Sequence, residues 1–150
     1  THCISSAASD VYKRQGQQIP TLVCGDFNST PDSGVYEFLN KGSAPGNHED
    51  FMDHVYGTFT SEGLKHNYAL RSAYSNIGEM PFTNLTPGFQ GNIDYIWYTS
   101  NTLAASCLLG EVDSTYLSRV VGFPNAHFPS DHVCILGEFK VKRLGIEATS

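Results

Sequence analysis

The chain has 150 residues and a mass of 16.4 kDa, which fits a single domain. Apolar residues make up 40% and charged residues 16%, so the chain is long and apolar enough for a core and does not resemble a disordered protein. Its net charge of −6 excludes a broad cationic surface for duplex nucleic acid, but a phosphoesterase whose carboxylates hold divalent cations stays open.

The first half of the chain predicts a tail and then a strand. Residues 1–15 show no periodicity and are interpreted as an irregular tail. The segment from Ile19 to Asn28 predicts a strand that leads into a loop, because its apolar run ends at Gly25.

A helix is predicted next. Ser33 and the residues before it offer N-cap chemistry, and Gly42 stands where a helix would end. Residues 42–50 then read as a polar loop.

The second half predicts strands. Residues 91–100 are rich in β-branched and aromatic side chains, residues 103–112 form a second run, and residues 133–141 form a third. Residues 114–121 predict one or two helical turns. A sheet-dominated α/β or α+β domain follows.

The four cysteines do not form a disulfide framework, because they are widely spaced and include no CxxC pair. Cys24 and Cys134 lie in apolar runs, where we expect free thiols to act as small hydrophobic groups. No secretory h-region and no membrane-spanning stretch is present in the sequence. We therefore expect a reducing compartment, the cytosol or the nucleus.

Three polar places interrupt the predicted strands. They are residues 25–29 (Gly-Asp-Phe-Asn-Ser), Asp94 within an aromatic strand, and residues 130–132 (Ser-Asp-His). Each alone has an ordinary interpretation as a turn or a cap, except that a carboxylate in an apolar strand needs a partner or a cleft. Together, three carboxylates, an amide and an imidazole are an inventory suited to metal-assisted phosphodiester hydrolysis.

These three motifs resemble the endonuclease/exonuclease/phosphatase superfamily, which has the fold of deoxyribonuclease I. Within it, the chain is most similar to the carbon catabolite repressor deadenylases, the catalytic subunits of the Ccr–Not complex. The resemblance runs from Ile19 to Phe139, and longer stretches carry the deadenylase part of it: residues 53–57, 70–74, 82–84 and 120–125.

The resemblance implies a role for each site residue. It makes Asp26, Asn28, Asp94 and His132 catalytic, with Asp94 paired to the histidine. It also implies a Mg²⁺ site, with ligands from Asp26, Asn28, Asp131 and His132. Asn84 and Phe89 would hold the terminal adenosine, and Phe89 would stack on the base, a contact that needs no basic surface.

The resemblance also sets the expected architecture: half of a four-layer α-β-β-α sandwich, to which this chain contributes one sheet with its helices. Residues 16–143 would form the C-terminal half of the domain, and residues 144–150 a tail. No segment matches the metal-binding Glu motif that the superfamily draws from earlier strands, so we expect the isolated chain to be inactive.

The leading functional hypothesis is a Mg²⁺-dependent 3′→5′ exoribonuclease that shortens poly(A) tails in the cytoplasm and nucleus. Its expected partners are single-stranded poly(A) RNA and Not-complex subunits, the latter through regions outside this chain, with no membrane. The alternatives are a nocturnin-like phosphatase, an abasic-site endonuclease or a catalytically inert half-domain. We interpret the histidines at positions 54, 66 and 127 as structural or surface residues.

Overall fold

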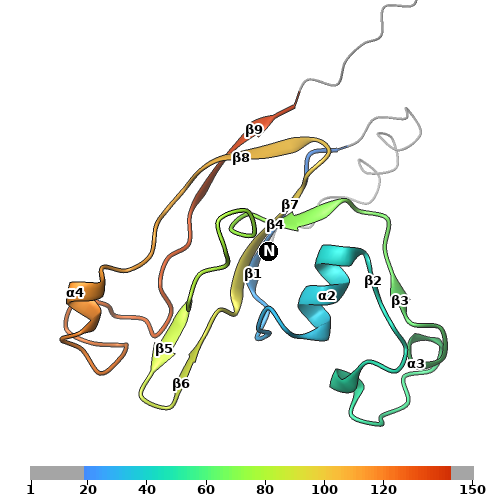
Figure 1. Cartoon of the computed structure of the whole chain (residues 1–150), viewed down its shortest axis with the longest axis horizontal. Helices are drawn as coiled ribbons and strands as arrows, with labels where there is room; N and C mark the ends of the chain where they lie inside the picture. Colours follow the sequence, from blue (N-terminus) through green and yellow to red (C-terminus); the bar gives the residue numbers. More distant parts are fainter. Residues whose placement is uncertain (1–18, 143–150) are drawn as a thin grey trace, which may run out of the picture.

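The computed structural model describes residues 19–142 (Figure 1). It has mixed α/β architecture built from small antiparallel sheets, and in this part of the chain no helix is long and apolar enough to cross a membrane. In chain order, the elements are β1 (Leu22–Asp26), α2 (Gly34–Lys41), β2 (Ser43–Ala44), a 3-10 helix η1 (Glu49–Phe51), α3 (Thr58–Glu62), β3 (Leu64–Lys65), β4 (Leu70–Ser72), β5 (Asn84–Thr86), β6 (Phe89–Gly91), β7 (Asp94–Thr99), β8 (Leu103–Leu108), α4 (Ser114–Leu117) and β9 (Gly137–Val141).

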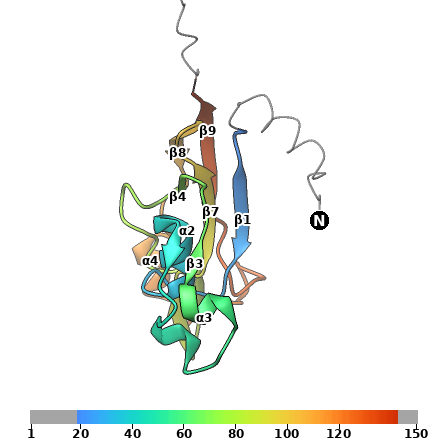
Figure 2. The same ribbon diagram turned by 90° about the vertical axis from the view of Figure 1, so that its right-hand side faces the viewer.

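Strand β7 is the centre of the main sheet, whose order is β1-β7-β4. Its side chains alternate between the two faces. Tyr95 and Trp97 meet Tyr36 of α2, with ring centroids 5.4 and 5.1 Å from the Tyr36 ring. Helix α2 therefore packs on one face of the sheet, and Figure 2 shows the sheet nearly edge-on.

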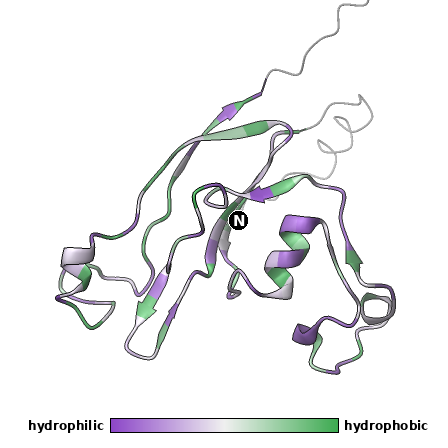
Figure 3. Cartoon of the chain, in the orientation of Figure 1, coloured by the Kyte–Doolittle hydropathy of each residue, from purple (hydrophilic) through white to green (hydrophobic). Residues whose placement is uncertain are grey.

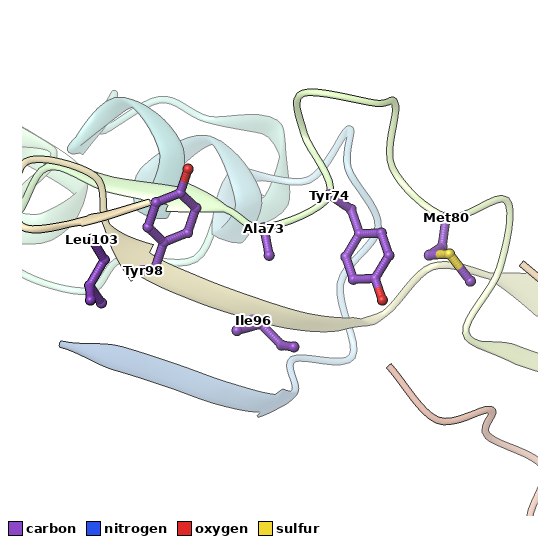
Figure 4. Close-up of a cluster of buried hydrophobic side chains, with 6 residues drawn as sticks. All are labelled: Ala73, Tyr74, Met80, Ile96, Tyr98 and Leu103. Carbon is purple, nitrogen blue, oxygen red and sulfur yellow. The ribbon is translucent and has the colours of Figure 1, made fainter. Parts of the chain in front are cut away.

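The opposite face of β7 carries a compact apolar cluster (Figure 4). Ile96 and Tyr98 pack there with residues of the β4 end and the β7–β8 turn, and Phe139 of β9 lies against the cluster. The buried members are Ala73, Tyr74, Met80, Ile96, Tyr98 and Leu103. This cluster joins the β8–β9 pair to the main sheet.

A second apolar cluster forms around Phe82, Phe123 and Val133. Phe123 is 1% exposed, and its N–H donates to the carbonyl of Leu85 at 2.7 Å. The cluster therefore holds the long segment after α4 against the β5–β6 hairpin, which places residues 130–132 beside the start of β7.

Helix α2 confirms the predicted boundaries. Ser33 accepts a hydrogen bond from the N–H of Tyr36 at 3.2 Å, and Gly42 ends the helix with a φ of +79°. The alternation of hydrophobic and hydrophilic segments along α2 is visible in Figure 3. Local signals sufficed here because the helix is capped by its own neighbours in sequence.

The predicted strands exist but are shorter than the apolar runs that indicated them. Strand β8 ends at Leu108 and β9 begins only at Gly137, so residues 109–112 and 133–136 lie outside the ladder. Within residues 19–142, the expected single sheet is instead one three-stranded sheet and three two-stranded pairs. The pairs β2–β3 and β5–β6 were not predicted, because strands of two or three residues leave almost no periodicity in a sequence.

Cys24 and Cys134, which were expected to act as small hydrophobic groups in apolar runs, are both exposed. Cys24 lies on β1, an edge strand whose five residues are all exposed in the described part of the chain. Cys134 precedes β9 and lies outside the β8–β9 pairing. Both are free, as is Cys107, so none of the described cysteines forms a disulfide; Cys3 and the expected tails at 1–15 and 144–150 lie outside the described residues.

Candidate active site

The loop that follows β1 carries the first two predicted site residues. Both oxygens of the Asp26 carboxylate accept hydrogen bonds from Asn28: Oδ1 from its N–H at 2.8 Å and Oδ2 from its side-chain Nδ2 at 3.2 Å. Asn28 has a φ of +48°, a left-handed conformation that Asn tolerates better than most residues. The backbone thereby turns back on itself and leaves both side chains exposed at the end of the strand.

Asp26 lies directly opposite Asp94, because these two residues form the last pair in the β1–β7 register. Directly opposed residues in an antiparallel pair project from the same face of the sheet. The register therefore brings Asp26 and Asp94, which are far apart in the sequence, to one end of one face.

Asp94 is hydrogen-bonded to His132, so this carboxylate in an aromatic strand has a partner. The distance from His132 Nδ1 to Asp94 Oδ2 is 2.7 Å, and the side chains are 29% and 17% exposed. A carboxylate only accepts, so Nδ1 carries the proton and donates it. The pair thus orients the ring and leaves Nε2 as the imidazole nitrogen that Asp94 does not use.

The strand-like segment that carries Asp131 and His132 also contacts the β5–β6 hairpin. Asn84 forms an isolated bridge with His132, and its Nδ2 donates to Asp131 Oδ2 at 3.2 Å. The N–H of Leu85 donates to the Asp131 carbonyl at 3.2 Å. Asn84 is 5% exposed, so its amide is fixed beside Asp131 rather than free in solvent.

The pKa of His132 is raised above its ordinary value of 6.5. The hydrogen bond to Asp94 is the largest cause, and the negative charges of Asp94, Asp131 and Asp26 add to it, while partial burial opposes it. The site therefore favours the imidazolium form and concentrates negative charge around it.

Phe89 lies on β6, next to this group in the hairpin. It is 45% exposed, and its ring lies over Gly91: a Cβ built on Gly91 would be only 2.6 Å from Phe89 Cζ. An exposed ring held by its own strand is a suitable platform for a flat ligand. The predicted stacking role has the exposure that it needs.

The predicted metal ligands meet only part of what a divalent cation requires. Asp26, Asn28 and Asp131 supply the hard oxygen donors that Mg²⁺ prefers. Within residues 19–142, however, no group of three or more His, Cys, Asp or Glu side chains is close enough to hold a metal ion. The described residues therefore do not complete a metal centre.

Tyr95 also contributes to the site, which its place in an aromatic strand does not indicate. Its hydroxyl donates toward the carbonyls of Ser29 at 2.9 Å and Asn92 at 2.8 Å, and its ring contacts Phe27 edge to face. Burial, followed by the charge of Glu79, raises the Tyr95 pKa, so the hydroxyl remains a donor. No sequence signal links Tyr95 to Ser29, which are 66 residues apart.

The histidines at positions 54, 66 and 127 lie in structural or surface positions. His66 Nε2 donates to the Phe38 carbonyl at 2.9 Å, and the exposed His127 ring packs edge-on against Tyr116. His54 is exposed beside Tyr56. None of the three belongs to the cluster around Asp94 and His132.

Comparison with solved structures identifies the fold. The structure of ANGEL2, described as a 2′,3′-cyclic phosphatase, superposes with a TM-score of 0.69 at 24% identity, covering 90% of this chain and 49% of that one. The catalytic domain of human nocturnin superposes with a TM-score of 0.52 at 23% identity, covering 91% and 38%. The mixed α/β chain thus corresponds to part of a deoxyribonuclease I-like sandwich, as expected.

Sequence comparison is more specific. The CCR4-Not complex 3′-5′-exoribonuclease subunit Ccr4 of Mycosarcoma maydis is 67% identical over 126 residues, which is 84% of this chain and 19% of that protein. The subunit of the same name from Schizosaccharomyces pombe is 60% identical over 126 residues, or 84% and 18%. The chain therefore spans about a fifth of the length of these curated relatives. The model of the Endonuclease/Exonuclease/phosphatase family matches residues 6–132, and the chain belongs to that family.

Proposed function

We propose that this chain is part of the catalytic domain of a 3′→5′ exoribonuclease that removes poly(A) tails. The observation that carries the proposal is the hydrogen-bonded Asp94–His132 pair, 2.7 Å between its polar atoms, in a chain 67% identical to a Ccr4 exoribonuclease subunit. An imidazole that is held by a carboxylate and has a raised pKa, beside two further aspartates, is suited to a reaction that develops negative charge on a phosphoryl group.

Each residue has a distinct proposed role. Asp26 accepts the proton of the attacking water, and Asn28, held by the Asp26 carboxylate, contacts the phosphate. His132, oriented by Asp94, donates a hydrogen bond to the phosphoryl oxygens as charge develops there. Phe89 stacks on the terminal adenine and Asn84 borders the same nucleoside, which sets the preference for a nucleotide end.

Enzymes of the family generally depend on a divalent metal ion. For this chain we propose Mg²⁺, held by oxygen donors from Asp26, Asn28 and Asp131 and by a further carboxylate from outside residues 19–142. His132, which the resemblance also implied as a ligand, is left out of this set, because its Nδ1 donates to Asp94 and its Nε2–H is assigned to the phosphoryl oxygens. When bound, the ion would offset the charge of the phosphoryl oxygens.

The proposed substrate is single-stranded poly(A) RNA, and the proposed partners are Not-complex subunits that bind regions outside this chain. The net charge of −6 agrees with a local, stacking-based contact to RNA rather than a broad basic surface. We place the activity in the cytoplasm and nucleus.

A segment exchange tests the proposal. Residues 19–142 replace the matching segment of the Mycosarcoma maydis relative, and the hybrid is incubated with Mg²⁺ and 5′-labelled oligo(A). We expect a ladder of shortened products that disappears with EDTA. Asp26→Ala and His132→Ala should each lower the rate by about 10²–10⁴-fold, the usual contribution of a positioned acid or base.

Glu62→Ala is the matched control, because this carboxylate is exposed on α3, away from the site. A folded hybrid that leaves oligo(A) intact would contradict the proposal. Cleavage of abasic DNA or release of phosphate from a dinucleotide, without shortening of oligo(A), would replace it with one of the other activities of the fold.

A further inference from the structure

Thr83 forms hydrogen bonds through its backbone N–H, its carbonyl and its hydroxyl oxygen at the base of the site. Its side chain is fully buried, at 0% exposure, although it carries a hydroxyl. That hydroxyl accepts two hydrogen bonds, from the N–H of Ile93 at 2.9 Å and from the N–H of Asp94 at 3.0 Å. The two lone pairs of one oxygen therefore satisfy two consecutive amides at the start of β7.

The backbone of Thr83 connects to the other half of the site. Its carbonyl accepts the N–H of Val133 at 2.8 Å, directly after His132, and its own N–H donates to the Gly91 carbonyl at 2.9 Å. One residue thus binds the main chain at Asp94 and the main chain next to His132.

We propose that Thr83 is the positioning residue of the Asp94–His132 pair. The hydroxyl sets the backbone from which the Asp94 side chain extends, and the carbonyl sets the backbone that carries His132, so their 2.7 Å hydrogen bond depends on both. The importance of this arrangement for catalysis rests on the proposed exoribonuclease function.

Shape alone does not account for a threonine here. Valine has nearly the same volume, and the neighbouring cluster of Phe82, Phe123 and Val133 is apolar. With valine, the amides of Ile93 and Asp94 would lose their acceptor, and an unpaired buried donor is costly. The hydroxyl is thus the part of the side chain that the site uses.

Thr102 offers a matched control within the same chain. It is 2% exposed, and its hydroxyl bonds Thr99, the last residue of β7, whereas Thr83 binds the first. Thr102→Val removes a buried, hydrogen-bonded hydroxyl at the end of the strand away from the site.

Proton NMR of the 150-residue chain at a fixed pH tests the geometry. The hydrogen-bonded imidazole N–H of His132 should give a downfield resonance, assigned by its loss in Asp94→Asn. In Thr83→Val we expect this resonance to disappear and the amides of Ile93 and Asp94 to exchange about tenfold faster or more, as for a lost hydrogen bond. Thr83→Ser, which keeps the hydroxyl, and Thr102→Val should both match the unaltered chain.

The same variants in the hybrid enzyme test the functional consequence. Thr83→Val should lower kcat by about tenfold or more with little change in KM, Thr83→Ser should restore it, and Thr102→Val should leave it unchanged. An inactive unsubstituted hybrid would contradict the proposed function, and the NMR result would then decide the role of Thr83 alone.

Retention of the downfield resonance and of amide protection in Thr83→Val would overturn the proposal, as would normal kcat in an active hybrid. If Thr83→Val does not fold, the proposal is tested by amide exchange at Ile93 and Asp94 in the unaltered chain and in Thr83→Ser. Slow exchange at both amides in both proteins supports the proposal. Exchange as fast as in an unprotected loop, or loss of the resonance in Thr83→Ser, refutes it.

Discussion

At the scale of single residues, the site depends on groups whose protonation is set by their neighbours. His132 is held by Asp94 and surrounded by further carboxylates, which raises its pKa. Tyr95 is buried and remains a hydroxyl donor to the Ser29 carbonyl. Both contacts have consequences that are measurable without substrate.

The Asp94–His132 pair should make stability depend on pH. Because the pKa of folded His132 lies above its unfolded value, the pair stabilises the fold fully below that unfolded value, about 6.5, and loses this contribution as pH rises through the folded pKa. Denaturant unfolding of the metal-free chain from pH 5 to 9 measures how the free energy of unfolding changes with pH. Subtracting the curve of Asp94→Asn isolates the pair from the other histidines, and identical curves would contradict the prediction.

Removal of the Tyr95 hydroxyl should loosen the loop that carries Asp26 and Asn28. Tyr95→Phe keeps the ring contact with Phe27 but leaves two carbonyls without this donor, at a cost of about 1–2 kcal/mol. In the hybrid enzyme we expect kcat to fall as well. Tyr74→Phe is the control, because its buried hydroxyl also donates to two carbonyls, Leu109 and Leu136, away from the site.

Equal loss of kcat in the two tyrosine variants would mean that Tyr95 acts only through stability. Thermal unfolding of both proteins establishes whether their stability losses are comparable. The contrast between them, rather than either value alone, carries the prediction.

At the scale of elements, the β5–β6 hairpin links the predicted nucleoside contacts to the proposed catalytic group around Asp94 and His132. Asn84 and Gly91 are opposite each other in its register, and Phe89 lies over Gly91. The Phe89 ring can lie in this position because Gly91 has no side chain.

Gly91→Ala should therefore displace the Phe89 ring and imitate part of Phe89→Ala. For Phe89→Ala we expect a loss of roughly 1–3 kcal/mol in poly(A) binding, the value of one base stack, and little change on a small phosphodiester without a base. Gly88→Ala is the control, since a Cβ there meets nothing within 4 Å. Equal losses on both substrates would make Phe89 a packing residue.

Structural features that depend on residues close together in the sequence could be predicted, whereas features that depend on distant residues could not. Strand β1, helix α2 and the start of the helical turn at Ser114 follow from neighbouring residues, and the structure confirms them. The short pairs β2–β3 and β5–β6 exist only through their partners, and the exposure of Cys24 depends on what covers an edge strand.

The candidate site likewise contains residues that could be recognised in the sequence and supporting contacts that could not. The chemistry of Asp94 and the motif at 130–132 were visible in the sequence, and the resemblance paired Asp94 with His132. The supporting contacts were not visible, because Tyr95 and Thr83 look like ordinary core positions. Both side chains bind backbone atoms of residues that are distant in the sequence. Such contacts cannot be predicted from residue types, because every residue has the same backbone groups.

At the scale of the whole molecule, the described residues leave apolar strand surface and an incomplete donor set. Leu22 and Val23 of β1 are 47% and 40% exposed, and Leu136 and Val141 near β9 are 57% and 67% exposed. In residues 19–142 no cluster of three or more potential metal ligands exists. Both features predict how the isolated chain behaves in solution.

We expect the isolated 150-residue chain to bind Mg²⁺ weakly and to show no shortening of labelled oligo(A). Mg²⁺ requires near-octahedral coordination by hard oxygens, which this donor set does not complete. Calorimetric titration and a gel assay measure the two properties. An EDTA-sensitive ladder that Asp26→Ala abolishes would show the opposite.

The same chain should bind a hydrophobic dye such as ANS, because its edge strand presents apolar side chains to water. Leu22→Ser should reduce the fluorescence, while Glu62→Ala on α3 should not. A signal equal to that of a compact control protein would contradict this expectation.

The pairing of β1 with β7 also bears on the order of events during synthesis. Asp26 can pair with Asp94 only after Asp94 has left the ribosome, and Asp94 can bind His132 only after His132 has been synthesised. Closing such long loops costs conformational entropy before the stabilising contacts form. Folding should therefore be slow compared with a helical domain of equal size. During that interval β1 is an unpaired strand open to other chains, and a nascent-chain chaperone would have its greatest effect there.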